Sequence, residues 1–286
     1  MSALPVSRHV SIGGLDQRYL QWGHDDAPVV VMLHGLRSYA HTWTAVAEVL
    51  CTNYRVIAPD FRGRGESAWD PQRDYFTNRY VADLEEWVDA LAMDRFTIVG
   101  HSMGGTVGYT YAARHPEQVV SLVVEDIGPG SSTDTAGAAR ILREVGSTPV
   151  RFESLDEVRA YWRRIRPDIS SEALASRIRH TVRADGDVAW VWKLDMAGIA
   201  EARASGNPAG PVDLWRCVEG LRCPTLVIRG ADSDFLPVTT CEEMARRQPL
   251  LTWAEISGAG HYVHDDNPGE FLGLLSQFLG DHGARN

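Results

Sequence analysis

The stretch from Phe96 to Thr106 reads Phe-Thr-Ile-Val-Gly-His-Ser-Met-Gly-Gly-Thr, a short apolar run followed directly by a glycine-rich turn. The run has the length and composition of a buried strand, and a helical pattern begins near Thr106. Ser102 therefore lies in a GxSxG turn between strand and helix, where glycines avoid a collision across the tight backbone. Such a turn presents the serine hydroxyl and aims the backbone N–H of Met103, at a helix start, towards developing negative charge.

Apolar runs on both sides of this stretch predict a mostly parallel sheet. They alternate with helical patterns, of which the clearest is the three-and-four spacing of apolar residues between Tyr80 and Leu91. Residues 9–12 and 18–22 predict an antiparallel hairpin joined through Gly13 and Gly14. This alternation indicates an α/β protein with a doubly wound sheet. The predicted parallel strands are Val29–Leu33, Arg55–Ala58, Phe96–Val99, Val119–Val124, Thr225–Ile228 and Thr252–Ile256.

The alternation stops after Val124. Residues 131–215 carry helical patterns rich in arginine and tryptophan, without a convincing buried strand. We predict that this segment is an inserted helical cap over the carboxyl ends of the strands, and that residues 1–130 and 216–286 form the core. The glycines and prolines between Gly206 and Pro211 would return the chain to the core.

The composition restricts the class of partner. Of the 286 residues, 44% are hydrophobic and 23% are charged, which is enough for a sizeable core. The formal net charge of −10 argues against a broad basic face for nucleic acid or anionic lipid. The Gly-Lys-Ser/Thr step of a P-loop is absent. We expect a small-molecule substrate, no nucleic-acid partner, and a monomer or homodimer.

The cysteines and the first residues bear on the cellular compartment. Cys51, Cys217, Cys223 and Cys241 form no CxxC pair and lack the spacing of metal ligands, which argues for reduced thiols. The opening Met-Ser-Ala-Leu-Pro-Val lacks the cationic and apolar segments of a leader peptide, and no apolar run approaches a membrane span. We therefore expect a cytoplasmic protein without membrane association.

Reactive side chains follow the predicted strands. In parallel α/β sheets ligands bind beyond the carboxyl ends of the strands, so these residues are expected on one rim. A serine hydroxyl needs a base to take its proton, and His261 is our choice because its Gly-Ala-Gly-His loop lets the ring reach back to Ser102. His101 is expected to point away from the serine, and His264 to be a surface or supporting residue. The rim residues are His34, Asp60, Ser102, Glu125, Asp126, Asp232, Asp234 and His261.

Five motifs together resemble the α/β-hydrolase superfamily, in its capped, cofactor-independent serine-hydrolase branch, over nearly the whole chain. The resemblance implies that the oxyanion hole pairs the N–H groups of Met103 and Leu36, that no cofactor is needed, and that the motif from Asp60 is a structural turn. Related capped members handle small acidic substrates such as enol-lactones and acylamino-methylene dicarboxylates. The motifs are Gly100–Gly104, His34-Gly35, Asp60–Ser67, Asp126–Pro129 and Gly258–His261.

Two aspartates compete for the position that orients the histidine. Asp126 lies 126 − 102 = 24 residues beyond the nucleophile. Several capped branches of the family that this chain resembles carry the orienting acid at that place. Asp234 lies after the next core strand, at the more widespread family position, but the loop departs from the usual Gly-x-x-Asp spacing by one residue. We favour Asp126, with Asp234 as the alternative. Glu125 is expected to face the other way and to cap or pair with an arginine.

The remaining polar and aromatic residues bear on two further questions, a metal site and a substrate pocket. His261, His264, Asp265 and Asp266 are close in sequence, but adjacent carboxylates seldom converge on one ion, so we predict no metal. Aromatic cap residues are candidates to line a substrate chamber, and arginines to bind a substrate carboxylate, although packing and solvation are the commoner roles. The candidate substrate-binding residues are Arg37, Trp162 and Trp192.

The predicted reaction is cleavage of a carboxylic ester, lactone or amide of a small molecule through an acyl-serine intermediate. Two alternatives remain open. One is a C–C bond hydrolase or another cofactor-free lyase or cyclase that uses the same serine, histidine and aspartate. The other is a small-molecule receptor that hydrolyses slowly. The enzyme assignment requires that Ser102 and His261 lie in contact.

Overall fold

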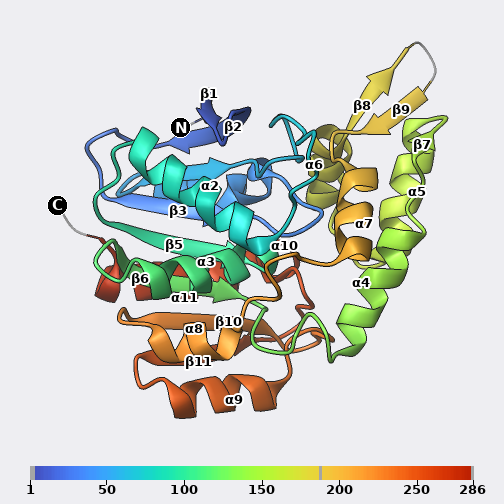
Figure 1. Ribbon diagram of the computed structural model, residues 1–286. Helices are drawn as coiled ribbons and strands as arrows, with labels where there is room; N and C mark the ends of the chain where they lie inside the picture. Colours follow the sequence, from blue (N-terminus) through green and yellow to red (C-terminus); the bar gives the residue numbers. More distant parts are fainter. Residues whose placement is uncertain (1–3, 187–188, 285–286) are drawn as a thin grey trace.

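The computed structural model describes residues 4–186 and 189–284, and its central feature is an eight-stranded sheet (Figure 1). The strands are β1 (Val6–Ile12), β2 (Leu15–Trp22), β3 (Val29–Leu33), β4 (Arg55–Pro59), β5 (Phe96–His101), β6 (Val119–Glu125), β10 (Thr225–Gly230) and β11 (Leu251–Ile256). Their order across the sheet is β1-β2-β4-β3-β5-β6-β10-β11. From β4 to β11 every pair is parallel, whereas β1 and β2 pair antiparallel, and β2 joins β4 antiparallel. The predicted fold class is confirmed.

Each of the six predicted parallel strands is present, and most run slightly further than their apolar stretch. β5 and β10 each extend two residues beyond the predicted end, because the neighbouring strand continues to supply backbone hydrogen bonds. The predicted hairpin is also present: Gly13 and Gly14 have φ of +58° and +74°, the left-handed region that a tight hairpin turn requires.

Helices cover both faces of the sheet. One face carries α1 (Thr44–Leu50) and α11 (Pro268–His282), and the other carries α2 (Thr77–Ala90), α3 (Met103–Arg114), α8 (Leu214–Gly220) and α9 (Val238–Arg247). A separate apolar cluster fills each interface. A 3-10 helix (Ala40–Trp43) and the short α10 (Val263–Asp266) lie in the loops after β3 and β11. The central parallel strands are therefore buried on both faces, as their continuous apolar sequences require, whereas the edge strand β1 is largely exposed.

Residues inserted after β6 form helices and a small sheet on one side of the core (Figure 1). The helices are α4 (Ala136–Gly146), α5 (Leu155–Ile165), α6 (Ser171–Thr181) and α7 (Met196–Ser205). Three antiparallel strands, β7 (Arg151–Phe152), β8 (Val182–Asp185) and β9 (Ala189–Trp192), add a sheet in the order β7-β9-β8. We call this insertion the cap. Its strands were not predicted, and the predicted boundary at residue 215 falls inside α8, which packs against α3 of the core.

Within the described ranges, no helix combines the length and apolarity needed to cross a bilayer. Met1–Ala3, part of the segment on which the expected lack of a leader peptide rests, lie outside the described residues.

Candidate active site

Ser102 stands in a strained turn between β5 and α3. Its φ of +52° and ψ of −117° are unusual for a residue with a side chain, and the turn is held by the Ser102 N–H, which donates to the Glu125 carbonyl at 3.0 Å. A Cβ on Gly104 would lie 2.1 Å from the Leu33 carbonyl oxygen, and a Cβ on Gly100 would lie 2.5 Å from that of Gly104. The glycines of the GxSxG pattern are therefore required by backbone contacts.

The imidazole of His261 reaches Ser102 from the loop after β11. Its Nε2 lies 3.0 Å from the serine Oγ, which is hydrogen-bonding distance, and its ring packs against Phe235 at a centroid distance of 4.3 Å. His101, beside the serine in sequence, donates from Nε2 to the His261 carbonyl at 2.8 Å. Burial keeps the pKa of His101 well below its usual value, so this ring is a neutral support for the His261 backbone.

The two candidate aspartates lie in different environments. Asp126 is buried, and its Oδ2 accepts from His261 Nδ1 at 2.7 Å and from the Ser233 hydroxyl at 2.5 Å. Asp234 instead accepts two hydrogen bonds from Arg140 of the cap, at 2.8 and 2.9 Å, and this pairing lowers its pKa. The structure thus brings Ser102, His261 and Asp126 together and places Asp234 in an ion pair between core and cap.

The turn after β3 runs directly against Ser102. A Cβ on Gly35 would lie 3.5 Å from the Ser102 Cβ, and the turn is closed by the Ser38 N–H, which donates to the Gly35 carbonyl at 3.2 Å. His34 donates from Nδ1 to the same carbonyl at 2.8 Å and accepts the Phe61 N–H at Nε2 at 3.2 Å. Burial lowers the pKa of His34 to about 3, so it shapes this turn as a neutral ring.

A cavity of about 360 Å³ opens onto Ser102, a volume in the range of small-molecule sites. Among the described residues that line it, Arg203 is the only charged side chain, and no aspartate or glutamate is present. Leu36 and Met103, the predicted oxyanion residues, are both in its wall. Core and cap contribute side chains such as Leu36, Tyr80, Ser102, Met103, Arg203 and Phe235.

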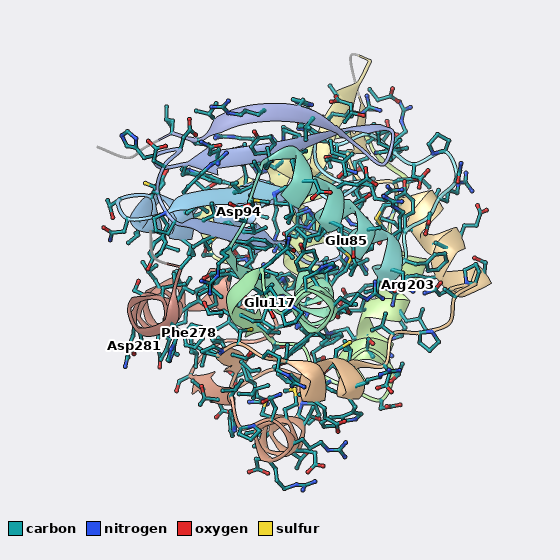
Figure 2. All side chains as sticks on the ribbon, turned by 60° about the vertical axis from the view of Figure 1, so that its left-hand side comes forward. Glu85, Asp94, Glu117, Arg203, Phe278 and Asp281 are labelled. Atoms are coloured by element: carbon teal, nitrogen blue, oxygen red, sulfur yellow. The ribbon has the colours of Figure 1, made fainter. Side chains whose placement is uncertain are left out.

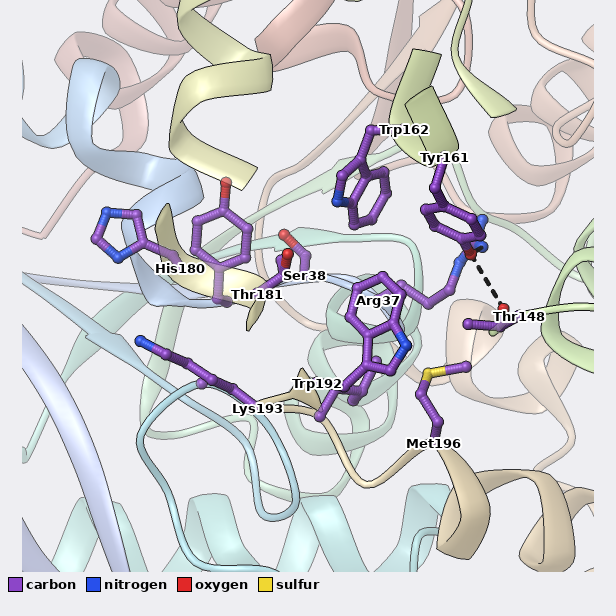
Figure 3. Close-up of a pocket in the computed structure, with 13 residues that line it drawn as sticks. Arg37, Ser38, Thr148, Tyr161, Trp162, His180, Thr181, Trp192, Lys193 and Met196 are labelled. Atoms are coloured by element: carbon purple, nitrogen blue, oxygen red, sulfur yellow. Dashed lines mark hydrogen bonds between the residues drawn. The ribbon is translucent and has the colours of Figure 1, made fainter. Parts of the chain in front are cut away.

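The predicted substrate-binding residues Arg37, Trp162 and Trp192 are not in the lining of this cavity. They surround a separate space of about 10 Å³, which is of the size of one water molecule (Figure 3). Arg37 is buried in an ion pair with Glu144 and donates to the Tyr161 hydroxyl at 3.2 Å. Trp192 donates to the Pro149 carbonyl at 2.7 Å. Arg37 thus joins the turn after β3 to the cap, whereas Trp162 and Trp192 pack against each other within the cap at a ring-centroid distance of 5.9 Å.

The four residues that are close in sequence after β11, His261, His264, Asp265 and Asp266, pair with other side chains. His264 was predicted at the surface or in support, and it is buried with its Nδ1 at 2.8 Å from both carboxylate oxygens of Glu125. Glu125 also accepts the backbone N–H of His264 at 3.0 Å, in the first turn of α10, so the expected capping role is present, whereas its charged partner is a histidine and not an arginine. Burial opposes protonation of His264, but the Glu125 charge prevails and raises its pKa. Within the part of the chain that the structure describes, no group of three or more His, Cys, Asp or Glu side chains is placed to hold a metal ion.

Comparisons with known proteins identify the family of the chain. The family described as the alpha/beta hydrolase fold matches residues 28–268. The chain is 32% identical to a 3-hydroxybutyrate-oligomer hydrolase of Cupriavidus necator, over 94% of this chain and 95% of that protein. It is 31% identical to a Bacillus subtilis protein provisionally named 2-succinyl-6-hydroxy-2,4-cyclohexadiene-1-carboxylate synthase, over 90% and 92%. The crystal structure of an E-2-(acetamidomethylene)succinate hydrolase superposes with a TM-score of 0.83 at 26% identity, covering 96% of this chain and 99% of that one.

Proposed function

The chain belongs to the family of alpha/beta-fold hydrolases, and we propose that it is a serine hydrolase that cleaves a carboxylic ester, lactone or amide of a small molecule through an acyl-serine intermediate. The observation that carries this proposal is the continuous contact from Ser102 through His261 to Asp126. A nucleophile, a base and an orienting carboxylate in hydrogen-bonding sequence are what acyl transfer by serine requires.

In the proposed mechanism Ser102 Oγ attacks the carbonyl carbon while His261 Nε2 takes the hydroxyl proton. Asp126 accepts the Nδ1–H of His261, which keeps the correct tautomer and stabilises the imidazolium. The tetrahedral oxyanion accepts from the N–H groups of Leu36 and Met103, each typically worth about 3 kcal/mol of transition-state binding. The imidazolium then protonates the leaving group, and a water molecule, activated by the same histidine, releases the acid from the serine.

We further propose that the substrate carries a carboxylate. Arg203, on α7 at the side of the molecule where cap and core meet (Figure 2), is the one charged residue among the described residues in the cavity wall. A guanidinium binds a carboxylate through two parallel hydrogen bonds, and a cavity without acidic side chains does not repel it. The names of the three similar proteins each contain a carboxylic acid, which supports the same substrate class.

The test pairs turnover with covalent labelling. The wild-type enzyme is assayed on p-nitrophenyl acetate and on the p-nitrophenyl monoester of succinate, and is then treated with a fluorophosphonate probe. We expect turnover of both esters, a preference for the acidic one, and labelling that the Ser102→Ala variant loses. Absence of both turnover and labelling would refute the hydrolase and favour a receptor.

A second candidate is a cofactor-free lyase or cyclase that uses His261 as a base without an acyl-enzyme. The similarity to the Bacillus subtilis protein, provisionally named as a synthase, favours it. Mass spectrometry of the enzyme quenched during turnover separates the two: the hydrolase accumulates a Ser102 adduct with the mass of the acyl group, and the lyase does not.

A further inference from the structure

Arg64 is a fully buried arginine whose contacts include no carboxylate among the described residues. It lies in the loop from Asp60 to Ser67, with 0% of its surface exposed. The neighbouring Arg62, by contrast, pairs with Asp70 at 2.5 Å and with Asp83 at 2.6 Å. Burying a charge without an opposite charge is costly, so the position of Arg64 calls for a reason beyond packing.

The contacts of Arg64 lead to the proposed oxyanion hole. Its Nε donates to the Leu36 carbonyl at 3.0 Å, and one terminal nitrogen donates to the Met103 sulfur at 3.6 Å. The other terminal nitrogen donates to the Arg62 carbonyl at 2.9 Å. One side chain thus touches both residues whose N–H groups would receive the oxyanion, while its own loop is braced by the third contact.

The guanidinium also lies directly behind the wall of the cavity. Its central carbon is 5.7 Å from the Tyr75 ring centre and 5.1 Å from that of Tyr80. These two rings and the two oxyanion residues are all in the lining of the cavity that opens onto Ser102. A positive charge in this buried position raises the local potential where negative charge develops during attack, and water screens it little.

We propose that Arg64 is a positioning residue for the oxyanion hole, which holds the Leu36 turn and Met103 against Ser102 and adds a fixed positive charge behind the N–H donors. This inference rests on the proposed function. A neutral amide could satisfy the Leu36 carbonyl alone, but it would supply no charge. A lysine would supply the charge but reach fewer of the three acceptors.

The experiment compares Arg64→Gln and Arg64→Lys with Arg177→Met, a matched control that removes another buried, ring-stacked arginine on the cap. Each enzyme is assayed for kcat and KM on the preferred p-nitrophenyl ester. Each is also titrated with a trifluoromethyl ketone that carries the same acyl chain, because its adduct with Ser102 places an oxyanion in the hole. The pH at which the bound adduct ionises is followed by ¹⁹F NMR.

We expect Arg64→Gln to lower kcat and ketone affinity by 10- to 100-fold, with KM within threefold of wild type and the adduct ionising about one pH unit higher. Arg64→Lys should recover part of the loss. Arg177→Met should change the thermal midpoint of unfolding without changing the pH at which the adduct ionises.

The inference would be overturned if both Arg64 variants kept the wild-type kcat and the wild-type pH of adduct ionisation. If Arg64→Gln fails to fold, Arg64→Lys decides alone: a lowered kcat and ketone affinity support the inference, and wild-type values of both overturn it. A wild-type enzyme that neither hydrolyses esters nor binds the ketone would instead refute the proposed function.

Discussion

The rim of the core and the cap are held in place by different kinds of interaction. At the rim, Ser102 and Asp126 each follow directly on a strand with φ of +52°, and the sheet fixes their backbone. The cap is attached through side chains: Arg166 donates to Asp265 and Asp266 at 2.7 and 2.6 Å, and Arg177 to Asp265 at 2.9 Å. The positions of Ser102 and Asp126 are therefore set by backbone geometry, whereas the position of the cap on the core is set by ion pairs.

The reactive groups of the core and the ion pairs of the cap meet in the loop after β11. Asp265 and Asp266 belong to α10, which begins two residues after His261. The cap therefore docks on α10, in the same loop that carries His261. The following predictions test how far the two systems are separate.

The largest expected effect is at the rim. Asp126→Asn should lower kcat/KM for the p-nitrophenyl esters by about 10³- to 10⁴-fold, because the amide no longer stabilises the imidazolium of His261. Asp234→Asn is the control and should cost less than tenfold, since that carboxylate pairs with Arg140. A larger loss from Asp234→Asn than from Asp126→Asn would assign the orienting role to the other loop.

Next in size is the attachment of the cap. Burial alone would raise the pKa of Asp265, but His264, Arg177 and Arg166 lower it, which marks a strongly stabilised carboxylate. Asp265→Asn leaves these cations without their shared partner and should lower the free energy of unfolding by about 3 kcal/mol in urea titrations. Asp185→Asn, which breaks the exposed pair with Arg151, should cost less than about 1 kcal/mol. Equal losses would mean that the buried pairs contribute no more than exposed ones.

A smaller effect concerns substrate selection by the cap. Arg203→Gln should lower kcat/KM for the succinate monoester by about tenfold, or about 1.4 kcal/mol, because a charge-assisted contact is lost. Turnover of the acetate ester should stay within twofold. Arg183→Gln, an exposed cap variant, is the control. A parallel loss on both esters would show that Arg203 supports the fold of the cap and not the substrate.

The smallest effect is the pH dependence of the junction between core and cap. His41 of the core stacks on His180 of the cap at 4.0 Å, and burial lowers their pKa values to about 4 and about 3. The pKa values in the folded state lie below the value near 6.5 in the unfolded state. The contribution of the two neutral rings to the free energy of unfolding is therefore complete above pH 6.5 and is lost as pH falls towards 4. Because both rings are only half-buried, we expect less than about 1 kcal/mol between pH 6.5 and 5.5.

His180→Phe keeps a ring but removes one titrating group. Urea titrations at pH 6.5 and 5.5 should therefore show a smaller loss of unfolding free energy in this variant than in wild type. An identical loss in the two proteins would contradict a role for the stacked pair.

The core was largely predictable from sequence, because its strands are apolar runs long enough to recognise. The predicted range Val29–Leu33 has the same bounds as β3. The side chains just after each strand are expected on one rim because the carboxyl ends of parallel strands lie at the same edge of the sheet. The cap sheet was missed because strands of two to four residues show no periodicity. The pairing of Glu125 with His264 was missed for another reason: it joins residues 139 positions apart.

The arginines show most clearly which contacts the sequence does not reveal. Arg37, Arg64 and Arg203 look alike in the sequence, and only the packed chain distinguishes a buried ion pair, a buried charge without a carboxylate and a cavity-lining cation. The motif from Asp60 to Ser67 was assigned a structural role as a whole. A signal for Arg64 existed in the presence of a second arginine in that motif, but its target, the turn at Leu36, is 28 residues away in sequence.

Lys193 is the single lysine in the chain, and it lies on the cap in an ion pair with Glu66 of the core. Its side chain is only 16% exposed, so the ammonium is shielded while the two parts are in contact. An amine-reactive dye would therefore find one side-chain target, apart from the terminal amine, and would reach it fastest when the contact opens. The labelling rate of Lys193 would therefore measure how often the contact with Glu66 opens, without any substitution.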